Sequence, residues 1–499
     1  MKLNYKRTIL VGFAFFIISA FWQAYDAIIP LILTNHFGLS QSWSGTVMSF
    51  DNVLAVFLLP LFGAISDKVC SRWGKRTPFI FIGTILAVIA FISLAFIDNS
   101  QLGAVMSTDI PSQYEAADAL RDEAYQMMEE ARKSGDEALI SAANARLAEV
   151  DEMFKSIASQ TFEITAGNIL PLVGFIGMLL VVLVSMAVFR SPAVALMPDV
   201  TVKSLRSKGN AVINLMGTAG GILVLVLGMI FSTSRIYMNY SWYVLAVCLL
   251  MLTGLVIFIL SVKEKLWSAE MLEDTRKLEG DEKNEGKNDT GEVRRLSKSE
   301  LVSLILILAS VALWYIGYNS ITSKYSVYAT RELGFDYNLT LIIAQAAAVV
   351  AYIPVGIISS RFGRRKTILA GIVMLASAFL LGNFITPLVP EIIMYPIFIL
   401  AGIGWATINV NSFPMVVELA RGGDVGKYTG YYYTASMAAQ IIAPNLSGVL
   451  YDALGMRNVF FVFGTVFVAL SFVTMFFVRH GDSKPEKQGA LESLAGADD

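Results

Sequence analysis

Long apolar segments recur along almost the whole chain of 499 residues and limit its possible folds more than any other feature. Half of the 78 charged residues lie in two stretches, 98–163 and 263–300, so the other 395 residues carry only 39 charges. Charged residues make up 16% of this chain, whereas a soluble protein has about 25%. The charge-poor part cannot fold as a water-soluble domain, so the chain is predicted to be a polytopic membrane protein.

Twelve segments are long enough to cross a bilayer, which takes about 20 mostly apolar residues per helix. Their apolar runs are continuous and do not alternate with polar residues, so helices are favoured over the strands of a barrel. The predicted spans are 9–33, 43–65, 78–97, 168–192, 209–232, 241–262, 300–321, 338–359, 367–387, 391–415, 428–450 and 457–479.

Lys and Arg are distributed unevenly between the predicted loops. With the N-terminus in the cytoplasm, the cytoplasmic side holds 29 of the 38 basic residues, and five of the other nine lie in 98–163. Short cytoplasmic loops carry an excess of Lys and Arg. We therefore expect an integral protein of the plasma (inner) membrane with both termini in the cytoplasm.

The charged segment 98–163 then lies outside, between the third and fourth spans. Apolar residues recur at spacings of three and four from Leu139 to Ile157, which is typical of an amphipathic helix. Ser134-Gly135 interrupts the helical pattern, so two helices in a hairpin are expected. The hairpin is either a solvated addition that packs on itself or a cap that binds an unidentified partner or captures substrate.

The second charged segment, 263–298, divides six spans from six, and its second half is predicted to be a disordered linker. Each half carries a similar basic motif after its second span: Arg72-Trp-Gly-Lys-Arg76 in the first and Arg361-Phe-Gly-Arg-Arg365 in the second. Two parallel six-helix repeats are a known transporter architecture with a substrate site between them. The fold class is thus an all-α membrane protein with two six-helix bundles and an outward-facing helical hairpin. The predicted domains are helices 1–3 (1–97), the hairpin insertion (98–163), helices 4–6 (164–262), the linker (263–298), helices 7–12 (299–480) and a disordered cytoplasmic tail (481–499).

Other functional classes have little support in the sequence. The net charge of −2 gives no basic surface for nucleic acid. The two cysteines, Cys70 and Cys248, and the two histidines, His36 and His480, lack the spacing of a metal site. No nucleophile–base pair or phosphate loop is visible, so we expect neither an enzyme nor a cofactor.

The paired basic motifs are candidates for a cytoplasmic gate. A carboxylate and a guanidinium at helix ends can hold two bundles in one state until the pair breaks. The alternative is an ordinary excess of positive charge in cytoplasmic loops. The predicted gate residues are Asp67, Arg72, Arg76, Asp199, Arg361, Arg365 and Glu418.

Several motifs resemble those of a known family. Phe50-Asp51-Asn52 and the run 71–79 are similar to the helix 2 to helix 3 signature of the glycoside–pentoside–hexuronide:cation symporters, in the major facilitator superfamily. The run 190–199 resembles the Gly-Pro-x-x-Ala-Leu-x-x-Asp run of the related sucrose transporters, and 206–210 and 409–414 fit bacterial members of that branch. The resemblance covers all twelve spans but not 98–163, and it implies the major facilitator fold and secondary active transport.

Two acids lie well inside predicted spans. Asp26 and Asp51 both sit roughly 10–12 Å below the outer surface at 1.5 Å per residue, and an ionisable residue at that depth is a functional candidate. Together they could bind a coupling ion; alternatively, each faces a watery vestibule or caps a break in the backbone. The resemblance implies a second acid on helix 2 where this chain has Ala55. One carboxylate fewer disfavours Na⁺, so H⁺ is the expected coupling ion.

Polar and aromatic residues gather on the helices that the resemblance implies as cavity lining, namely helices 1, 4, 7 and 10. Sugar hydroxyls bind Asn, Gln, Asp and Arg, and sugar C–H faces pack on aromatic rings. A single Tyr or Trp can instead belong to the membrane interface, and a lone Asn can bond a neighbouring helix. The predicted substrate-binding residues are Trp22, Gln23, Tyr25, Arg190, Tyr315, Tyr318, Asn319, Trp405, Asn409, Asn411 and, on helix 11, Gln440.

The predicted function is proton-coupled symport of a di- or oligosaccharide, or another glycoside, by a monomer in the lipid bilayer. Asp51 is expected to be the main coupling residue, with Asp26 as its partner or as a sugar ligand. Two alternatives stay open: an exporter of amphipathic drugs or metabolites, and a non-transporting membrane sensor that uses the outer hairpin.

Overall fold

The computed structural model describes residues 3–69, 71–202, 205–282, 297–419 and 425–481. In these ranges the chain is helical, and its one β-bridge joins Ser71 to Gly74. The second half of the predicted linker, the predicted tail and Cys70 lie outside the described residues.

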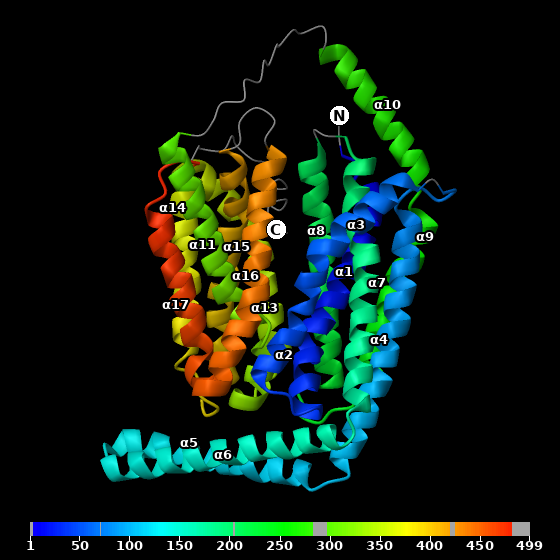
Figure 1. Cartoon of the computed structure of the whole chain (residues 1–499). Helices are drawn as coiled ribbons and strands as arrows, with labels where there is room; N and C mark the ends of the chain where they lie inside the picture. Colours follow the sequence, from blue (N-terminus) through cyan, green and yellow to red (C-terminus); the bar gives the residue numbers. More distant parts are fainter. Residues whose placement is uncertain (1–2, 70, 203–204, 283–296, 420–424, 482–499) are drawn as a thin grey trace.

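Two groups of long helices stand side by side (Figure 1). The first bundle comprises α1 (Tyr5–Leu31) with its π-helical continuation η1 (Ile32–His36), α3 (Phe50–Lys68) with the short α2 (Gln41–Met48) before it, α4 (Thr77–Met106), α7 (Leu170–Val200), α8 (Arg206–Phe231) and α9 (Ser241–Ser261). The second comprises α11 (Lys298–Thr322), α13 (Tyr337–Phe362), α14 (Arg364–Gly382), α15 (Met394–Val417), α16 (Val425–Leu454) and α17 (Met456–Phe476), with the short α12 (Tyr325–Tyr328), η3 (Ala329–Leu333) and η4 (Glu391–Ile393) between them.

Ten of the described helices are long and apolar enough to cross a membrane. The two other long bundle helices are α13, whose apolar part covers only Tyr337–Tyr352, and α16. Both lie between the bundles, α13 against α8 and α16 against α2. A helix that faces protein on several sides needs less apolar surface than one that faces lipid. The predicted fold class is confirmed.

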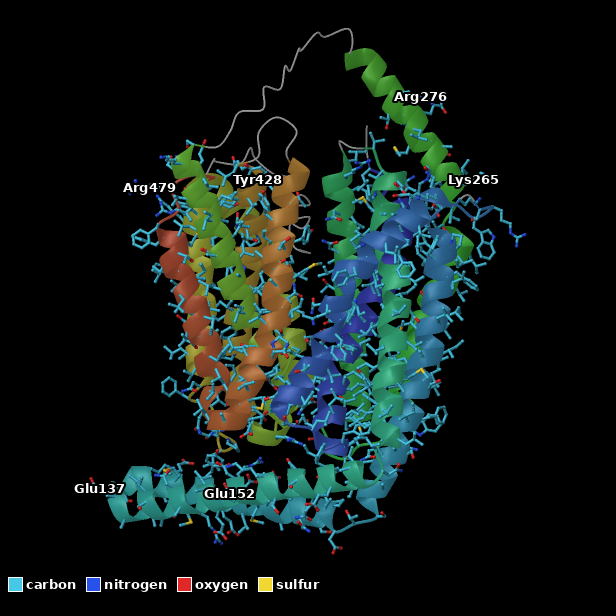
Figure 2. All side chains as sticks on the ribbon, viewed as in Figure 1. Glu137, Glu152, Lys265, Arg276, Tyr428 and Arg479 are labelled. Carbon is cyan, nitrogen blue, oxygen red and sulfur yellow. The ribbon has the colours of Figure 1, made fainter. Side chains whose placement is uncertain are left out.

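The insertion forms a hairpin of α5 (Ile110–Ser134) and α6 (Glu137–Gly167). Gly135, between them, has the left-handed φ of 69° that glycine adopts without strain. The side chain of Asp136 then caps α6 by accepting from Ala138 N (2.9 Å). The hairpin runs across one end of the bundles, and α10 (Glu264–Glu282) lies at the other end (Figure 1), where its Glu270 pairs with Arg7 near the start of α1. We call these ends the hairpin side and the termini side; Glu152 marks the first and Lys265 the second in Figure 2.

The hairpin contacts both bundles. Thr165 Oγ1 of α6 donates to the Phe37 carbonyl after η1 (2.9 Å). Arg121 of α5 donates to the Arg331 carbonyl of η3, in the second bundle. An element inserted in the first half of the chain therefore reaches across to the second half.

Helix α4 continues to Met106, beyond its predicted end at residue 97. The polar run that begins at Asp98 suggested a loop, but Asp98 is buried and accepts from the ring of His36 (Nδ1–Oδ1, 2.6 Å). Gln101 Nε2, one turn on, donates to the His36 carbonyl (3.0 Å). Because these polar groups have buried partners on η1, the helix extends into the base of the hairpin.

Candidate functional site

A cavity of about 350 Å³ lies between the two bundles. Its walls come mainly from α1 and α8 of the first bundle and from α11, α13 and α15 of the second, with single or paired residues from α12, α14 and α17. Most of the lining is apolar or aromatic. The polar, non-aromatic lining residues include Gln23 and Asp26 of α1, Thr218 of α8 and Gln345 of α13; the others are Ser19, Thr322 and Ser326.

A hydrogen bond joins the two bundles at this cavity. Gln345 Nε2 donates to Gln23 Oε1 at 2.6 Å. Glycines of α8 allow the close approach of α1, since a Cβ on Gly220 would lie 2.4 Å from the Phe16 carbonyl oxygen. The run Gly217-Thr-Ala-Gly-Gly221 is the sequence signal for this contact, but the sequence did not single out Thr218 as cavity lining.

An aromatic pair forms part of the second bundle's wall. Tyr318 of α11 and Trp405 of α15 stack with ring centroids 3.6 Å apart and planes 4° apart. Tyr315 meets Trp405 edge-on, with centroids 5.3 Å apart. Such a pair is fixed by its own packing and offers a flat apolar surface to a ligand.

Two carboxylates belong to the first bundle's side of the site. Asp26 is exposed to the cavity. Asp51, in the first turn of α3, lies within electrostatic range of Asp26 and of Arg190 on α7. Asp51 Oδ1 accepts from its neighbour Asn52 through both N (2.6 Å) and Nδ2 (2.7 Å). The helix is interrupted at Ser49, between α2 and α3. Asp51 therefore lies close to a break in the backbone, which is also what the alternative interpretation of this acid predicts.

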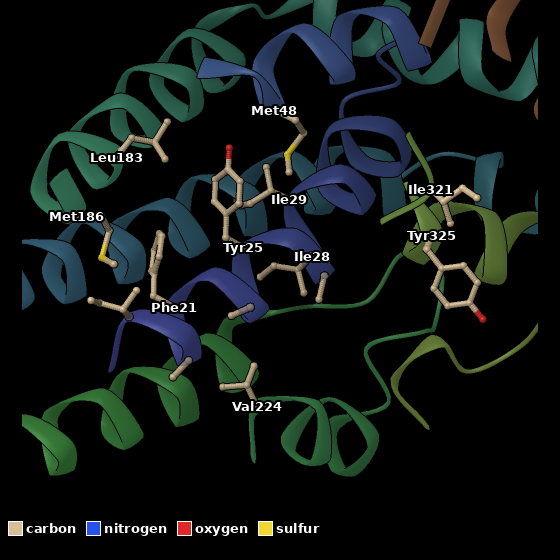
Figure 3. Packing of buried hydrophobic residues seen from close by; sticks show 14 of the residues in the cluster. Phe21, Tyr25, Ile28, Ile29, Met48, Leu183, Met186, Val224, Ile321 and Tyr325 are labelled. Atoms are coloured by element: carbon tan, nitrogen blue, oxygen red, sulfur yellow. The ribbon is translucent and has the colours of Figure 1, made fainter. Parts of the chain in front are cut away.

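Aromatic packing fixes this part of α1. Tyr25 is 1% exposed and packs among Phe21, Ile29 and Met48 (Figure 3). Trp22 lies edge-on to Tyr25 (centroids 5.3 Å apart), and the Arg190 guanidinium lies 5.7 Å from the centroid of the Trp22 ring. The Arg190 charge thus lies over the Trp22 ring and within electrostatic range of the Asp51 carboxylate.

The cavity includes only part of the predicted substrate set. Gln23, Tyr318 and Trp405 line it, together with Asp26. Asn319 Nδ2 donates to the Tyr315 carbonyl (2.8 Å) and Asn411 Nδ2 to the Thr407 carbonyl (2.9 Å), so both amides bond their own helices. The predicted residues outside the lining are Trp22, Tyr25, Arg190, Tyr315, Asn319, Asn409, Asn411 and Gln440.

On the hairpin side the bundles are in tight contact. Thr46 Oγ1 of α2 donates to Asn445 Oδ1 of α16 (2.8 Å). A Cβ on Gly45 would lie 2.2 Å from the Pro444 carbonyl oxygen, so the two helix backbones touch there. Arg331 Nε donates to Asn35 Oδ1 (2.5 Å), which joins η3 to η1.

The predicted gate residues of the first half meet on the termini side. Arg76 Nη2 donates to Asp67 Oδ1 (2.5 Å) and Arg76 Nε to Asp199 Oδ2 (2.8 Å), so one guanidinium joins the ends of α3, α4 and α7. Burial lowers the pKa of Arg76, but both carboxylates raise it, and the net shift is upward. Arg72 is exposed and lies over the ring of Trp73 (5.4 Å).

Glu264, at the start of α10, is a member of this cluster that the sequence did not reveal. Its buried carboxylate accepts from the backbone N–H groups of Lys75 (2.6 Å), Arg76 (2.9 Å) and Thr77 (2.8 Å), and so caps α4. Gly74 makes room for it, because a Cβ there would lie 2.2 Å from Glu264 Cδ. Capping residues are usually local in sequence, and no local pattern points to one 187 residues away.

In the second half of the chain, a different arginine of the repeated motif forms the ion pair. Arg364 pairs with Glu418, whereas Arg365, which aligns with Arg76, donates to the Phe476 carbonyl and lies over the Phe476 ring. Arg361 is exposed at the end of α13. The repeated motif thus keeps an arginine–carboxylate pair but shifts it by one residue.

Comparison with known families agrees with the fold. The chain matches the family model described as MFS/sugar transport protein over residues 10–105 and 158–390, and the model of the Major Facilitator Superfamily over residues 328–496. The gap in the first match, 106–157, falls in the hairpin.

Curated relatives match over short stretches. The chain is 32% identical over 83 residues to "Multi-drug resistance efflux pump PmrA homolog" of Lactococcus lactis subsp. lactis (strain IL1403), which is 17% of this chain and 20% of the relative. It is 29% identical over 116 residues to "MFS-type transporter ppzB" of Metarhizium rileyi (strain RCEF 4871), which is 23% of each chain. The matched region therefore spans less than a quarter of either relative.

Solved structures match over nearly the whole chain. The inward open conformation of the xylose transporter XylE from E. coli has a TM-score of 0.61 at 12% identity, with 98% of this chain and 99% of that chain covered. A POT family transporter in complex with 5-aminolevulinic acid has a TM-score of 0.61 at 11% identity, with 94% and 95% covered. At such low identity, these matches establish the fold alone.

Proposed function

The chain belongs to the MFS/sugar transport protein family of the major facilitator superfamily, and on this premise we propose that it imports a small glycoside together with a proton by alternating access. The observation that carries the proposal is Asp26, an acid exposed to a cavity whose opposite wall holds the stacked rings of Tyr318 and Trp405. In this proposal the hairpin side faces outward and the termini side faces the cytoplasm.

The chemistry of the cavity supports a sugar ligand. The Gln23 and Gln345 amides can each donate and accept, and the Asp26 carboxylate can accept from a hydroxyl. The Trp405 and Tyr318 rings suit the C–H face of a sugar ring. A volume of about 350 Å³ is near the lower end of the range for small-molecule sites, about 300–1,000 Å³, so a glycoside with one or two sugar rings is favoured over a longer oligosaccharide.

The two acids support proton coupling. A charged carboxylate is costly to enclose away from water, and a bound proton removes that charge. We infer that Asp26 and Asp51 share the proton, with Arg190 stabilising Asp51 when it is ionised. The coupling must be reciprocal, so that the proton tightens glycoside binding and the glycoside tightens proton binding.

Export of amphipathic drugs or metabolites is the second candidate. The mainly apolar lining, with Leu341, Ile397 and Phe398, favours such a substrate. The short match to a relative named as a multi-drug resistance efflux pump points the same way. A substrate panel separates the two functions, because the exporter would leave glycosides untouched.

Uptake into proteoliposomes tests the proposal. The purified protein is given a panel of α- and β-linked glycosides under an imposed pH gradient, and the internal pH is recorded. We expect glycoside uptake that acidifies the lumen and that is lost in Asp26→Asn and Asp51→Asn. The control is Glu115→Gln, an exposed acid on α5.

Three results would overturn parts of this proposal. Uptake driven by Na⁺ and insensitive to pH would keep the glycoside and reject the proton. Flux of amphipathic cations without glycoside flux would favour the exporter. No flux of either class from correctly folded protein would favour a non-transporting sensor.

A further inference from the structure

A second and larger concavity lies on the outer surface of the second bundle. It has a volume of about 850 Å³ and is formed by α13, α14 and α15. Both α13 and α14 pack on α15, which forms the floor, and the short turn at Gly363 joins them on the termini side. We call this concavity the lateral groove.

Small side chains set the depth of the lateral groove. Ala347 and Ala351 of α13 and Ala370 of α14 all line it. The floor cannot move outward, because α15 is locked to α14 at glycines: a Cβ on Gly371 would lie 3.0 Å from the Gly404 carbonyl oxygen. The hollow is therefore fixed by backbone packing and is open to a flexible apolar chain.

One end of the lateral groove is charged. Lys366, in the first turn of α14, is exposed and is the one charged side chain among the described residues that line the groove. Phe362, the last residue of α13, lies beside it in the lining. On the termini side this places an ammonium at the level where helices leave the hydrocarbon, which is the depth of lipid phosphates.

We propose that the lateral groove binds an anionic phospholipid, with one acyl chain between α13 and α14 and its phosphate against Lys366. The apolar walls match an acyl chain, and the single cation at the termini-side end matches the headgroup charge. A neutral phospholipid has the same acyl chain but no net negative charge, so it gains less from Lys366 than an anionic phospholipid does.

The position of the groove gives the bound lipid a consequence for transport. Helix α13 separates it from the central cavity: Gln345, Ala348 and Tyr352 line the cavity, whereas Ala347 and Ala351 line the groove. Pro354, also in the groove, removes one backbone hydrogen bond from this helix. An acyl chain bound in the lateral groove therefore packs against the face of α13 opposite the cavity, near the position where Pro354 removes a backbone hydrogen bond.

Native mass spectrometry of the full-length protein tests the proposal without reference to transport. The protein is reconstituted in vesicles of equal parts phosphatidylcholine and phosphatidylglycerol, extracted in mild detergent and analysed for bound lipid. We expect one retained phosphatidylglycerol, preferred over phosphatidylcholine by about fivefold, as for one lysine near an anionic headgroup. Lys366→Gln should abolish the preference, whereas Lys366→Arg should keep it.

Two further variants make the test specific. Ala370→Leu fills the groove and should remove the retained lipid of either type, because the chain loses its space. Lys298→Gln, an exposed lysine at the start of α11 on the same side, is the matched control and should leave binding unchanged. Equal retention of both lipids by the unmodified protein, or a preference that survives Lys366→Gln, would overturn the proposal whether or not the protein transports glycosides.

Discussion

Asp452 of α16 binds Ser42 of α2 across the boundary between the two bundles. Ser42 N donates to Asp452 Oδ2 (2.8 Å), and Ser42 Oγ donates to the same oxygen (2.5 Å). Gln41 N donates to Asp452 Oδ1 (2.8 Å). The carboxylate thus caps the N-terminus of α2 from the other bundle, where the helix dipole favours a negative charge.

We expect Asp452→Ala to open the hairpin side. Losing the cap should shift the equilibrium between closed and open forms by about tenfold toward open, since a helix cap contributes about 1 kcal/mol and charged hydrogen bonds contribute more. Spin labels at Trp43→Cys and Leu454→Cys, both exposed at the ends of α2 and α16, report the separation in a background without the native cysteines. Asp452→Asn should have a smaller effect and Glu115→Ala none; unchanged distances in Asp452→Ala would contradict the capping role.

Lys324 introduces a pH dependence close to this cap. Its side chain is fully buried between α11 and α12, and its ammonium has no hydrogen-bond partner among the described residues. Burial lowers the pKa of Lys324 to about 7, although Asp452 raises it; Arg331 adds to the lowering. The unfolded chain therefore binds one more proton than the folded protein from about pH 7 to about pH 10, and stability due to this group rises with pH across that window.

Lys324→Met should remove this dependence. Near pH 6 the variant should melt at least about 2 °C above the unmodified protein, because a buried unpaired charge is gone, and the difference should shrink toward pH 9. Thermal melting at several pH values measures it. The exposed Lys298→Met serves as the control, and a constant difference at all pH values would refute the titration of Lys324.

The sequence could predict the helices because membrane spans are local signals. A run of apolar residues must be helical in lipid whatever its neighbours are, so each of the twelve predicted spans overlaps one long helix. The agreement is poorest at two C-terminal ends: α4 continues to Met106 beyond its predicted end at residue 97, and α7 continues to Val200 beyond its predicted end at residue 192. The end of α4 was missed because it depends on a distant partner: the burial of Asp98 becomes favourable only through His36, 62 residues earlier. The sequence around Asp98 does not indicate that His36 is its partner.

The candidate site was predictable only in part for a related reason. Residue type and helix number were enough to predict Gln23, Asp26, Tyr318 and Trp405, which line the cavity. For the other predicted residues, the rotation of each helix about its own axis decides whether the side chain faces the cavity. Asn411 belongs to a lining helix, but its amide bonds the Thr407 carbonyl one turn earlier. In α15 the apolar pattern is nearly uniform around the helix, so the sequence does not show which face meets the cavity.

Glu264→Ala should destabilise the protein. Its loss leaves three backbone N–H groups at the start of α4 without their acceptor, and the buried ones of Arg76 and Thr77 alone should cost about 2 kcal/mol or more. The thermal midpoint measured by reaction of the buried Cys248 with a thiol dye should fall by several degrees. Glu270→Ala removes only the half-exposed pair with Arg7 and should cost about 1 kcal/mol or less; equal losses in the two variants would argue against the cap.

Gly45→Ala should prevent the hairpin side from closing. The added Cβ would lie 2.2 Å from the Pro444 carbonyl oxygen. The α2 backbone fixes the position of that Cβ and the oxygen belongs to the α16 backbone, so the two helices must move apart. The labels at positions 43 and 454 should then show a longer distance, and uptake should fall because the carrier cannot complete its cycle. Gly448→Ala, whose Cβ would lie 2.6 Å from the Gln41 carbonyl oxygen, should act in the same way.

Gly103→Ala and Gly177→Ala are the matched controls, since a Cβ at either position meets nothing within 4 Å. Both lie inside helices, where alanine is favoured over glycine by about 1 kcal/mol, so these variants should transport normally and melt slightly higher. A steric origin requires that Gly45→Ala differ from both controls in the label distance. If Gly45→Ala showed the same label distance as both controls, the contact between α2 and α16 would not be what limits the closed state.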